Sequence, residues 1–375
     1  MTEYRHGADR IAEFDSLFRG KRLGIITNAT GLDSRMHPTY RILHERFNLC
    51  RIFAPEHGLF GAIQAGEKVG KDVEPVTGIE VQSLYGSAAA ASYEGLDAVV
   101  YDIQDLGLRF YTYIYVMAKG MQMAAKAGIP FAVLDRQNPL GLSVTDGTVL
   151  DTRFASGVGK FGLASRYGLT CGELAGFLNE TEHIGCNLQV VPCAGLDRRS
   201  DCIDIALPFV EPSPNIPTAA SAFVYAGMVV LEGTNLSEGR GTTHPFELFG
   251  APYIDGDKMT DYLRGLGFEG ALLRSARFTP TFSKHAGTVC AGTEILLTDR
   301  HRFDAFRFGL CAVDYVRNTY PKEFSYVKWG EKYALDHILG TDAFRAPDYN
   351  TERFVTEQRK KAAEFARKTE SYRIY

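Results

Sequence analysis

The chain has 375 residues, which is more than one hydrophobic core usually serves, so its length predicts two domains. The apolar fraction of 45% and the charged fraction of 23% are typical of globular proteins. A formal net charge of −4 gives no basic footprint for nucleic acid, and no apolar run reaches the ~18 residues needed to cross a bilayer.

Seven cysteines form an odd set without a Cys-x-x-Cys pair, which favours buried free thiols over a disulfide framework or a zinc site. We therefore expect no metal. The first residues carry no apolar stretch of the kind found in signal peptides. This predicts a cytoplasmic protein, or an extracytoplasmic one if a leader has been removed. The sequence leaves the oligomeric state open.

Apolar strand-like segments alternate with helical ones over the first half of the chain. Strands are predicted at 21–28, 49–54, 80–85, 97–103 and 129–134. Helices are predicted at 38–47 and 113–127. Continuous apolar strands separated by helices are typical of a parallel sheet covered on both faces. We therefore expect an α/β fold with a Rossmann-like, mostly parallel sheet.

Polar residues stand at or just past the ends of several predicted strands. They are Asn28, the pair Glu56-His57, Asp102 with Asp105, and Arg136 with Asn138. In open α/β sheets, ligands bind at the carboxyl ends of the strands, so this set predicts a binding edge. Strand ends also need turn formers and helix caps, which is the alternative for any single member.

Two of these groups carry the chemistry. Glu56 is the better candidate for a general acid, because a partly desolvated carboxyl group can hold its proton near neutral pH, and His57 stands beside it. A glutamate that caps a helix is the alternative. Asp102 is a further catalytic candidate; Asp105 and Arg109 can bind substrate or form a structural ion-pair network, and Tyr111 can stack on a sugar ring.

The proline-rich segment 212–217 cannot continue a helix or a central strand, and it reads as a rigid connector near a domain boundary. Asn215 within it is a candidate substrate contact. We expect a Rossmann-like catalytic domain at 1–228 and a smaller α+β domain at 229–375 that completes the site. A polar helix is predicted at 351–368.

The segment 232–247 is the densest group of functional residue types in the chain. Neither the helical nor the strand period appears in it, so packing alone does not explain its composition. Glycines allow backbone to approach a ligand, and hydroxyl and amide side chains suit a hydroxyl-rich substrate. The candidate substrate-binding residues here are Thr234, Asn235, Glu238, Arg240 and Thr242. A solvated loop is the alternative.

Several well-known cofactor and nucleophile motifs are missing from the sequence. Thr27-Asn-Ala-Thr-Gly31 follows the first strand, where a dinucleotide-binding fold carries Gly-x-Gly-x-x-Gly. No nucleophile elbow, phosphate loop or zinc-protease motif is found either. We therefore expect no cofactor.

The motifs taken together resemble the exo-β-N-acetylmuramidase (NamZ) family, from about Lys21 to the C-terminal region. The matching motifs include Thr27-Asn28 with Thr30-Gly31, Pro55-Glu-His-Gly58, Ser83-Leu-Tyr-Gly86, Asp102-Ile-Gln-Asp105 with Arg109, Leu134-Asp-Arg136 with Asn138-Pro139, Pro212-Ser-Pro-Asn-Ile-Pro-Thr218 and Ser237-Glu-Gly-Arg-Gly-Thr-Thr243. Gln137 departs from the proline that the family usually has before Asn-Pro.

The resemblance implies a Rossmann-like domain and a smaller C-terminal domain with the active site between them. It also implies exo-acting release of N-acetylmuramic acid from the non-reducing end of peptidoglycan fragments, with Glu56 as the acid. The expected partner is thus a muropeptide or peptidoglycan oligosaccharide. Two alternatives stay open: a nucleotide-dependent enzyme on the same sheet, and a non-catalytic sugar-binding protein. The sequence does not identify the second catalytic group.

Overall fold

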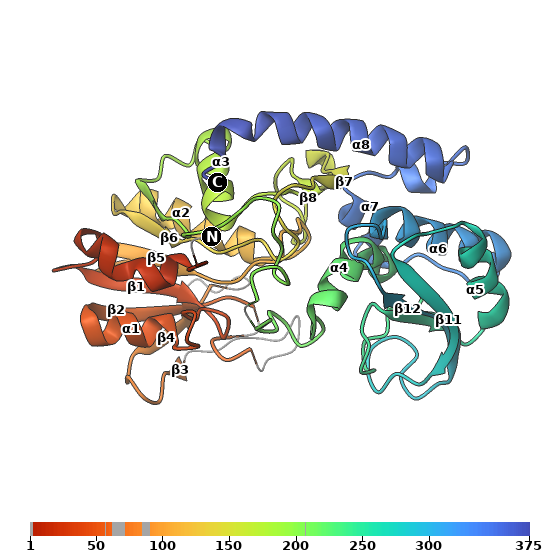
Figure 1. Cartoon of the computed structure of the whole chain (residues 1–375), viewed down its shortest axis with the longest axis horizontal. Helices are drawn as coiled ribbons and strands as arrows, with labels where there is room; N and C mark the ends of the chain where they lie inside the picture. Colours follow the sequence, from red (N-terminus) through yellow and green to blue (C-terminus); the bar gives the residue numbers. More distant parts are fainter. Residues whose placement is uncertain (1–2, 57, 62–71, 85–90, 207) are drawn as a thin grey trace.

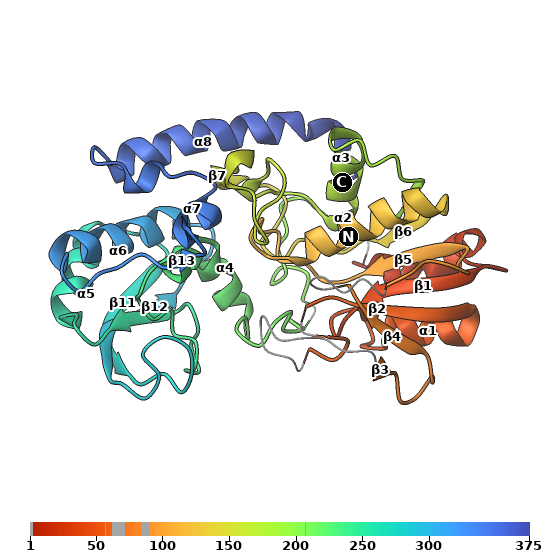
Figure 2. The same cartoon turned by 180° about the vertical axis from the view of Figure 1, so that it is seen from behind.

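The computed structural model describes residues 3–56, 58–61, 72–84, 91–206 and 208–375. Figure 1 and its reverse view in Figure 2 show two parts side by side, with one long helix crossing over both. Among the helices that the structure describes, none has the length and apolar character needed to span a bilayer.

The first part is built on a seven-stranded sheet of order β3-β4-β2-β1-β5-β6-β9. The strands are β1 (Arg22–Thr27), β2 (Asn48–Ala54), β3 (Asp72–Val73), β4 (Glu80–Ser83), β5 (Ala98–Asp102), β6 (Phe131–Leu134) and β9 (Leu188–Val191). All neighbouring pairs are parallel except β3 with β4. The predicted Rossmann-like, mostly parallel sheet is confirmed.

Alternating residues of each strand point to opposite faces, and each face has its own helical cover. Ile25 packs in a cluster with residues of η1 (Gly7–Leu17) and α1 (Thr39–Arg46). Its neighbour Ile26 packs in the larger cluster with α2 (Tyr113–Ala127) and α3 (Cys171–Thr181). Burial on both faces explains why these strands read as continuous apolar runs.

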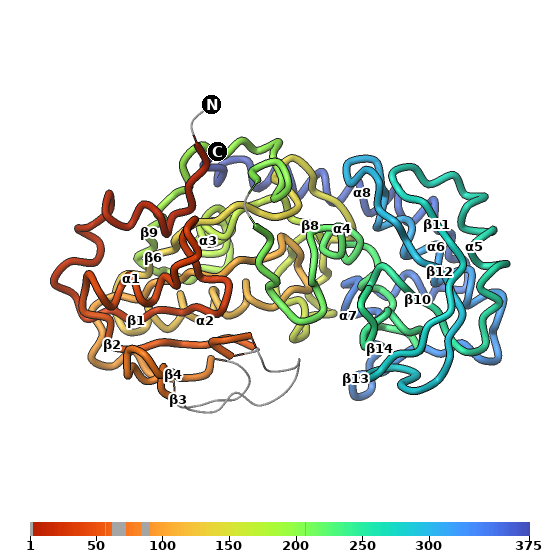
Figure 3. The backbone as a smooth tube through the Cα atoms, turned by 60° about the horizontal axis from the view of Figure 1, so that its bottom comes forward, coloured from red at the N-terminus to blue at the C-terminus, as the bar shows by residue number. Residues whose placement is uncertain are grey.

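The second part holds a smaller antiparallel sheet of order β10-β12-β11, formed by Leu248–Ala251, Cys290–Leu297 and Ala271–Phe278. Its helices are α4 (Ala219–Met228), α5 (Gly256–Gly265), α6 (Ala305–Thr319) and α7 (Ala334–Leu339), with a short turn η3 (Val229–Gly233) after α4 and a hairpin of β13 (Lys328–Trp329) and β14 (Lys332–Tyr333). α4 lies between the two sheets (Figures 1 and 3). Gly227 allows α4 to touch α6, because a Cβ there would lie 1.7 Å from the carbonyl oxygen of Ala305.

α8 (Thr351–Lys368) has the predicted bounds and contacts both parts. Phe354 packs against Phe306 at 6.5 Å between ring centroids, and Phe365 packs against Phe177 of α3 at 5.7 Å. Beneath α8 lie β7 (Asp146–Val149) and β8 (Ala164–Arg166); short 3₁₀ turns complete the chain at Thr152–Phe154, Ala343–Arg345 and Glu370–Tyr372. Because α8 returns to the first part, the division at residue 228 stays a prediction.

Candidate functional site

The residues that were predicted to form a binding edge follow neighbouring strands of the sheet. β2, β1, β5 and β6 are consecutive neighbours and parallel, so their carboxyl ends lie along one edge. This places Glu56, Asn28, Asp102 and Arg136 at the ends of adjacent strands. The sequence prediction that these residues share an edge is therefore supported by the register of the sheet.

Glu56 follows β2 and is half-buried. Its Oε2 accepts a hydrogen bond of 3.0 Å from the hydroxyl of Thr112, the residue before α2. His57, the other member of the predicted catalytic pair, lies outside the described residues. The structure thus places one titratable candidate, Glu56, where the first turn of α2 meets the strand edge.

Tyr113 connects this carboxylate to the neighbouring strand and to the connector. Its hydroxyl interacts with the Asn28 side chain and donates a 2.7 Å hydrogen bond to the carbonyl of Pro212. Burial raises the pKa of Tyr113, and the nearby charge of Glu56 raises it further. Asn215, in the same connector, is also buried. The proline-rich segment therefore lies against the strand edge, as a site between the two parts requires.

Asp102 and Arg136 form a buried ion pair between the ends of β5 and β6. Arg136 Nε donates to Asp102 Oδ1 at 2.5 Å and Nη2 donates to Oδ2 at 2.8 Å. Nη2 also donates to the carbonyl of Leu32 at 2.6 Å. The Asp102 side chain is 0% exposed and the Arg136 side chain is 3% exposed. Both oxygens of Asp102 are engaged, so the geometry supports a structural role; catalysis by Asp102 stays a prediction.

Asp105 and Asn138 are also buried, and each forms hydrogen bonds within the protein. Asp105 Oδ2 accepts from the backbone of Gly107 at 2.6 Å and from the Tyr167 hydroxyl. Burial raises the pKa of Asp105 to about 6. Asn138 donates to the carbonyl of Leu169 at 3.1 Å. These contacts support a framework role, and substrate contact by either residue stays a prediction.

Arg109 is fully buried and reaches the second part of the molecule. Its Nη2 donates to the carbonyl of Ile338 at 3.0 Å, at the C-terminal end of α7, and to the hydroxyls of Thr148 and Ser165. A cation at a helix C-terminus is stabilised by the helix dipole. Burial lowers the pKa of Arg109 to about 10. These contacts link the two parts. Tyr111 lies nearby in sequence and packs edge-on against Tyr113 at 5.0 Å.

Three residues of the segment 232–247, Glu232, Glu238 and Arg240, form a charged cluster with Lys284. Arg240 Nη2 lies 2.7 Å from Glu232 Oε1, and Arg240 Nε lies 3.3 Å from Glu238 Oε1. The other oxygen of Glu238 binds Lys284 Nζ at 2.9 Å. Burial raises the pKa of Glu232, and Arg240 opposes that rise. The four formal charges cancel.

The hydroxyl and amide residues of this segment mainly shape the loop. Thr234 is fully buried and donates to the carbonyl of Leu231 at 2.9 Å. Thr242 donates to the carbonyl of Gly239 at 2.6 Å. The amide of Asn235 donates to the carbonyl of Glu323 at 2.8 Å. Their contact with a substrate stays a prediction.

Tyr225 of α4 joins the Glu56 region to the 232–247 cluster. Its ring packs against Phe110 at 5.3 Å and against Phe246 at 4.5 Å. Burial raises the pKa of Tyr225 well above its ordinary value, and the charges of Glu232 and Glu56 add to the rise. Tyr225 therefore packs between Phe110, two residues before Thr112, and Phe246, over which the guanidinium of Arg240 lies.

Four residues of this region were not among the predicted site residues: Thr112, Tyr225, Glu232 and Lys284. Glu232 is the first residue of the segment 232–247, whose composition predicts a functional loop. The signal for Lys284 was weaker: a lysine in the polar, glycine-containing stretch 280–287. Thr112 and Tyr225 gave none, because a threonine before a helix and a tyrosine on an apolar helix are common structural features.

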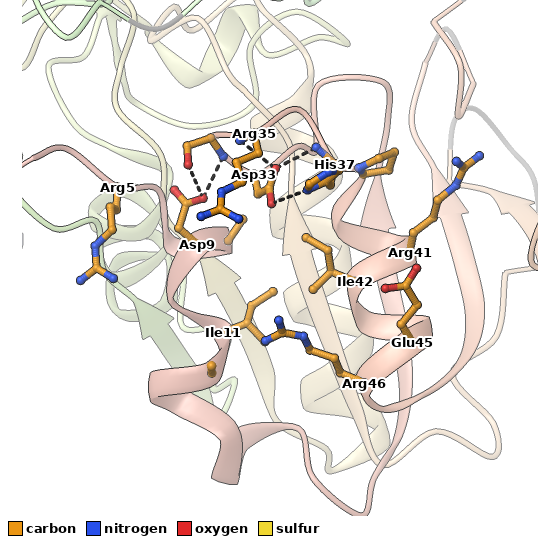
Figure 4. A pocket seen from close by; sticks show the side chains of 14 residues that line it. Arg5, Asp9, Ile11, Asp33, Arg35, His37, Arg41, Ile42, Glu45 and Arg46 are labelled. Carbon is orange, nitrogen blue, oxygen red and sulfur yellow. Dashed lines mark hydrogen bonds and ion pairs between the residues drawn. The ribbon is translucent and has the colours of Figure 1, made fainter.

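Two cavities in the described part of the chain are lined by neither Glu56 nor Glu232. A surface cavity of about 660 Å³ lies between η1 and α1, lined by Arg5, Asp9, Arg35, His37 and Arg46 among others (Figure 4), and includes none of the predicted site residues. A second space of about 60 Å³ lies beside Thr30, Gln104 and Arg136, near the ends of β1 and β5. Ligand pockets usually enclose about 300–1,000 Å³, so this space is small for a nucleotide.

Among the described residues, Asp201, Asp204 and His301 lie close enough together to be considered as metal ligands. Arg300 already contacts both carboxylates, at 2.7 Å from Asp204. The guanidinium of Arg300 therefore already balances the charge of these carboxylates.

Comparison with known proteins covers the whole chain. The family model described as exo-beta-N-acetylmuramidase NamZ, N-terminal, matches residues 23–220, and the C-terminal model matches residues 223–375. The peptidoglycan beta-N-acetylmuramidase NamZ of Bacillus subtilis (strain 168) is 40% identical over 97% of this chain and 89% of its own length.

Two crystal structures share the fold, both of DUF1343 family proteins from Bacteroides fragilis NCTC 9343. The first is 32% identical, with full coverage of both chains and a TM-score of 0.91. The second is 26% identical, with coverage of 100% and 99% and a TM-score of 0.77.

Proposed function

We propose that this chain, which belongs to the exo-β-N-acetylmuramidase NamZ family, removes N-acetylmuramic acid from the non-reducing end of peptidoglycan fragments. It is a glycoside hydrolase. The observation that carries the proposal is the position of Glu56, which follows the parallel strand β2 and accepts a hydrogen bond from Thr112. Phe110, two residues before Thr112, packs on Tyr225, whose ring packs on Phe246 beneath the guanidinium of Arg240.

Glu56 is the general acid of the proposed reaction. The leaving group is a sugar hydroxyl, which departs as an alkoxide unless a proton reaches the glycosidic oxygen as the bond breaks. The hydrogen bond from Thr112 holds one carboxylate oxygen in place. The side chain keeps partial exposure, so a substrate can reach it.

Arg240 is proposed to recognise the lactyl carboxylate, which distinguishes muramic acid from glucosamine. A guanidinium can bind a carboxylate through two parallel charge-assisted hydrogen bonds. The other predicted candidate, Arg136, keeps only 3% exposure and already binds both oxygens of Asp102. Arg240 also contacts two carboxylates, those of Glu232 and Glu238, but it keeps 22% exposure, and this exposure favours it over Arg136.

The two alternatives have less support. A nucleotide-dependent enzyme would use the crevice at the ends of β1 and β5, where the described space is small and the ion pair of Asp102 with Arg136 closes the edge. A non-catalytic sugar-binding protein needs no proton donor, so Glu56→Gln should leave its affinity for the sugar intact.

The deciding experiment incubates the protein with a chromogenic β-N-acetylmuramide and the matching N-acetylglucosaminide, without added cofactor. We expect colour release from the muramide only. A peptidoglycan chain with muramic acid at its non-reducing end should yield single muramic acid units first, with a shortened remainder. Internal cuts, disaccharide products or comparable hydrolysis of the glucosaminide would contradict the proposal.

A further inference from the structure

We propose that Glu232 is the second carboxyl group of the hydrolysis and that it takes the proton from the attacking water. This inference rests on the proposed function and extends it to a residue that was not among the predicted site residues. Glycoside hydrolases generally use a pair of carboxyl groups that flank the scissile bond.

The backbone of Glu232 is held firmly. It belongs to η3, the short turn after α4, and the next residue is Gly233. A Cβ on Gly233 would lie 2.7 Å from the Cα of Leu335, so the turn packs directly on α7. The Gly233 carbonyl also accepts a 3.0 Å hydrogen bond from the backbone of Val327. A group that must meet a reacting water gains from such fixed placement.

The side chain of Glu232 is the accessible carboxylate of the charged cluster. It keeps 21% exposure, and Arg240 holds its Oε1 at 2.7 Å. Glu238, by contrast, keeps 3% exposure and is contacted on both oxygens, by Arg240 and by Lys284. Burial raises the pKa of Glu232 above its usual value, and a carboxylate with a raised pKa is a stronger base.

Contacts connect Glu232 to Glu56. Glu56 binds Thr112, two residues after Phe110, whose ring packs on Tyr225. Tyr225 in turn packs on Phe246, over which the guanidinium of Arg240 lies at 5.4 Å. Arg240 binds Glu232. The Tyr225 hydroxyl also interacts electrostatically with both carboxylates.

The other nearby carboxylates are less suitable. Both oxygens of Asp102 bind Arg136, and its side chain is fully buried. Asp105 is buried beside Tyr167. Glu247 accepts a 2.5 Å hydrogen bond from Ser221 at the start of α4. Glu232 is therefore the candidate that combines exposure with a path of contacts toward Glu56 through Arg240, Phe246 and Tyr225.

The step balances as a hydrolysis with one water. The water oxygen forms a bond to the anomeric carbon while the bond from that carbon to the leaving oxygen breaks, and the bonding electrons go to the leaving oxygen. Glu56 gives its proton to that oxygen, and Glu232 takes a proton from the water. Exchange with solvent then removes the proton from Glu232 and returns one to Glu56.

The test uses the full chain and a 4-nitrophenyl β-N-acetylmuramide. Glu232→Gln should lower kcat by about 10²–10⁴-fold, the usual range for loss of a positioned base. Glu232→Ala leaves room for a small anion, so added azide should restore part of the rate and give a muramoyl azide product. The matched control is Glu247→Gln, in the same segment, which should keep kcat within about threefold.

Several outcomes would overturn the inference. A folded Glu232→Gln variant with wild-type kcat removes Glu232 from the reaction. Loss of activity in Glu232→Ala without azide product assigns it to positioning Arg240 instead. Should Glu232→Gln not fold, Glu232→Asp decides: the shortened carboxylate must lower kcat, and an unchanged kcat overturns the role. If the wild-type chain releases no muramic acid, the proposed function itself has failed, which is a distinct result.

Discussion

Arg136 binds both carboxylate oxygens of Asp102 and so joins the carboxyl ends of β5 and β6 inside the protein. In a dinucleotide-binding sheet, the ligand lies in the crevice where the strand order reverses. In this sheet the corresponding crevice lies between β1 and β5. Here the Nη2 of Arg136 also binds the Leu32 carbonyl in the loop after β1. The ion pair thus occupies the carboxyl ends of β5 and β6, and the candidate acid Glu56 follows β2, which is two positions from β5 in the sheet.

Breaking this ion pair should destabilise the fold strongly. Asp102→Asn leaves a buried guanidinium without its charge partner, and removing one partner of a buried pair typically costs about 3–5 kcal/mol. Urea unfolding gives the free energy change. Asp261→Asn, which breaks an exposed pair with Arg264, should change it far less. A loss of activity in Asp102→Asn with full stability would instead revive Asp102 as a catalytic residue.

Replacing Glu56 should abolish acid catalysis and spare the fold. Glu56→Gln should lower kcat by about 10²–10⁴-fold on a disaccharide whose leaving group is a sugar. The loss should be smaller on a 4-nitrophenyl glycoside, because that leaving group departs with little help from an acid. Steady-state kinetics on the two substrates measures the contrast. Equal losses on both, or near wild-type kcat on the disaccharide, would contradict the assignment.

Arg240→Lys should weaken recognition of muramic acid. Lysine keeps the charge but cannot form two parallel hydrogen bonds to a carboxylate. We expect KM for the muramide to rise about tenfold, which corresponds to about 1.4 kcal/mol. Hydrolysis of the glucosaminide, which we expect to be poor in the wild type, should not change. Unaltered muramide kinetics in a folded variant would remove Arg240 from substrate recognition.

The stability of the protein should fall as the pH rises through about 6, because burial raises the pKa of Asp105 to that value. The folded protein holds this proton more tightly than the unfolded chain does. The stabilisation is therefore complete below the ordinary pKa of an aspartate and is lost as the pH passes the folded value. Asp105→Asn cannot ionise, so its free energy of unfolding should change less between pH 5 and pH 8. An identical pH dependence in the variant and the wild type would exclude Asp105 as a contributor.

Much of the fold could be predicted because it depends on neighbouring residues. The apolar run before Asn28 predicted β1, and the spacing at 351–368 predicted α8 with its observed bounds. Strand ends follow from the same patterns, and the carboxyl ends of neighbouring parallel strands share an edge. That rule is enough to place Asn28, Glu56 and Arg136 on one edge from the amino-acid sequence alone.

Burial and partners depended on tertiary packing. The sequence shows that Arg109, Thr234 and Arg240 are polar, but not that the first two are fully buried and the third keeps contact with solvent. Lys284 reaches Glu238 from a loop that is distant in sequence, and that pairing is set by how the loop folds back.

The sequence by itself therefore determined the α/β class, the positions of the first strands along the chain and the edge that holds Glu56. Periodicity and strand direction are local properties, so a single chain can reveal them. Only the tertiary structure packed Tyr225 between Phe110 and Phe246 and gave Arg240 its two carboxylate partners. Those contacts form where α4 lies between the two sheets. They depend on how segments distant in sequence pack together, which no local sequence pattern predicts.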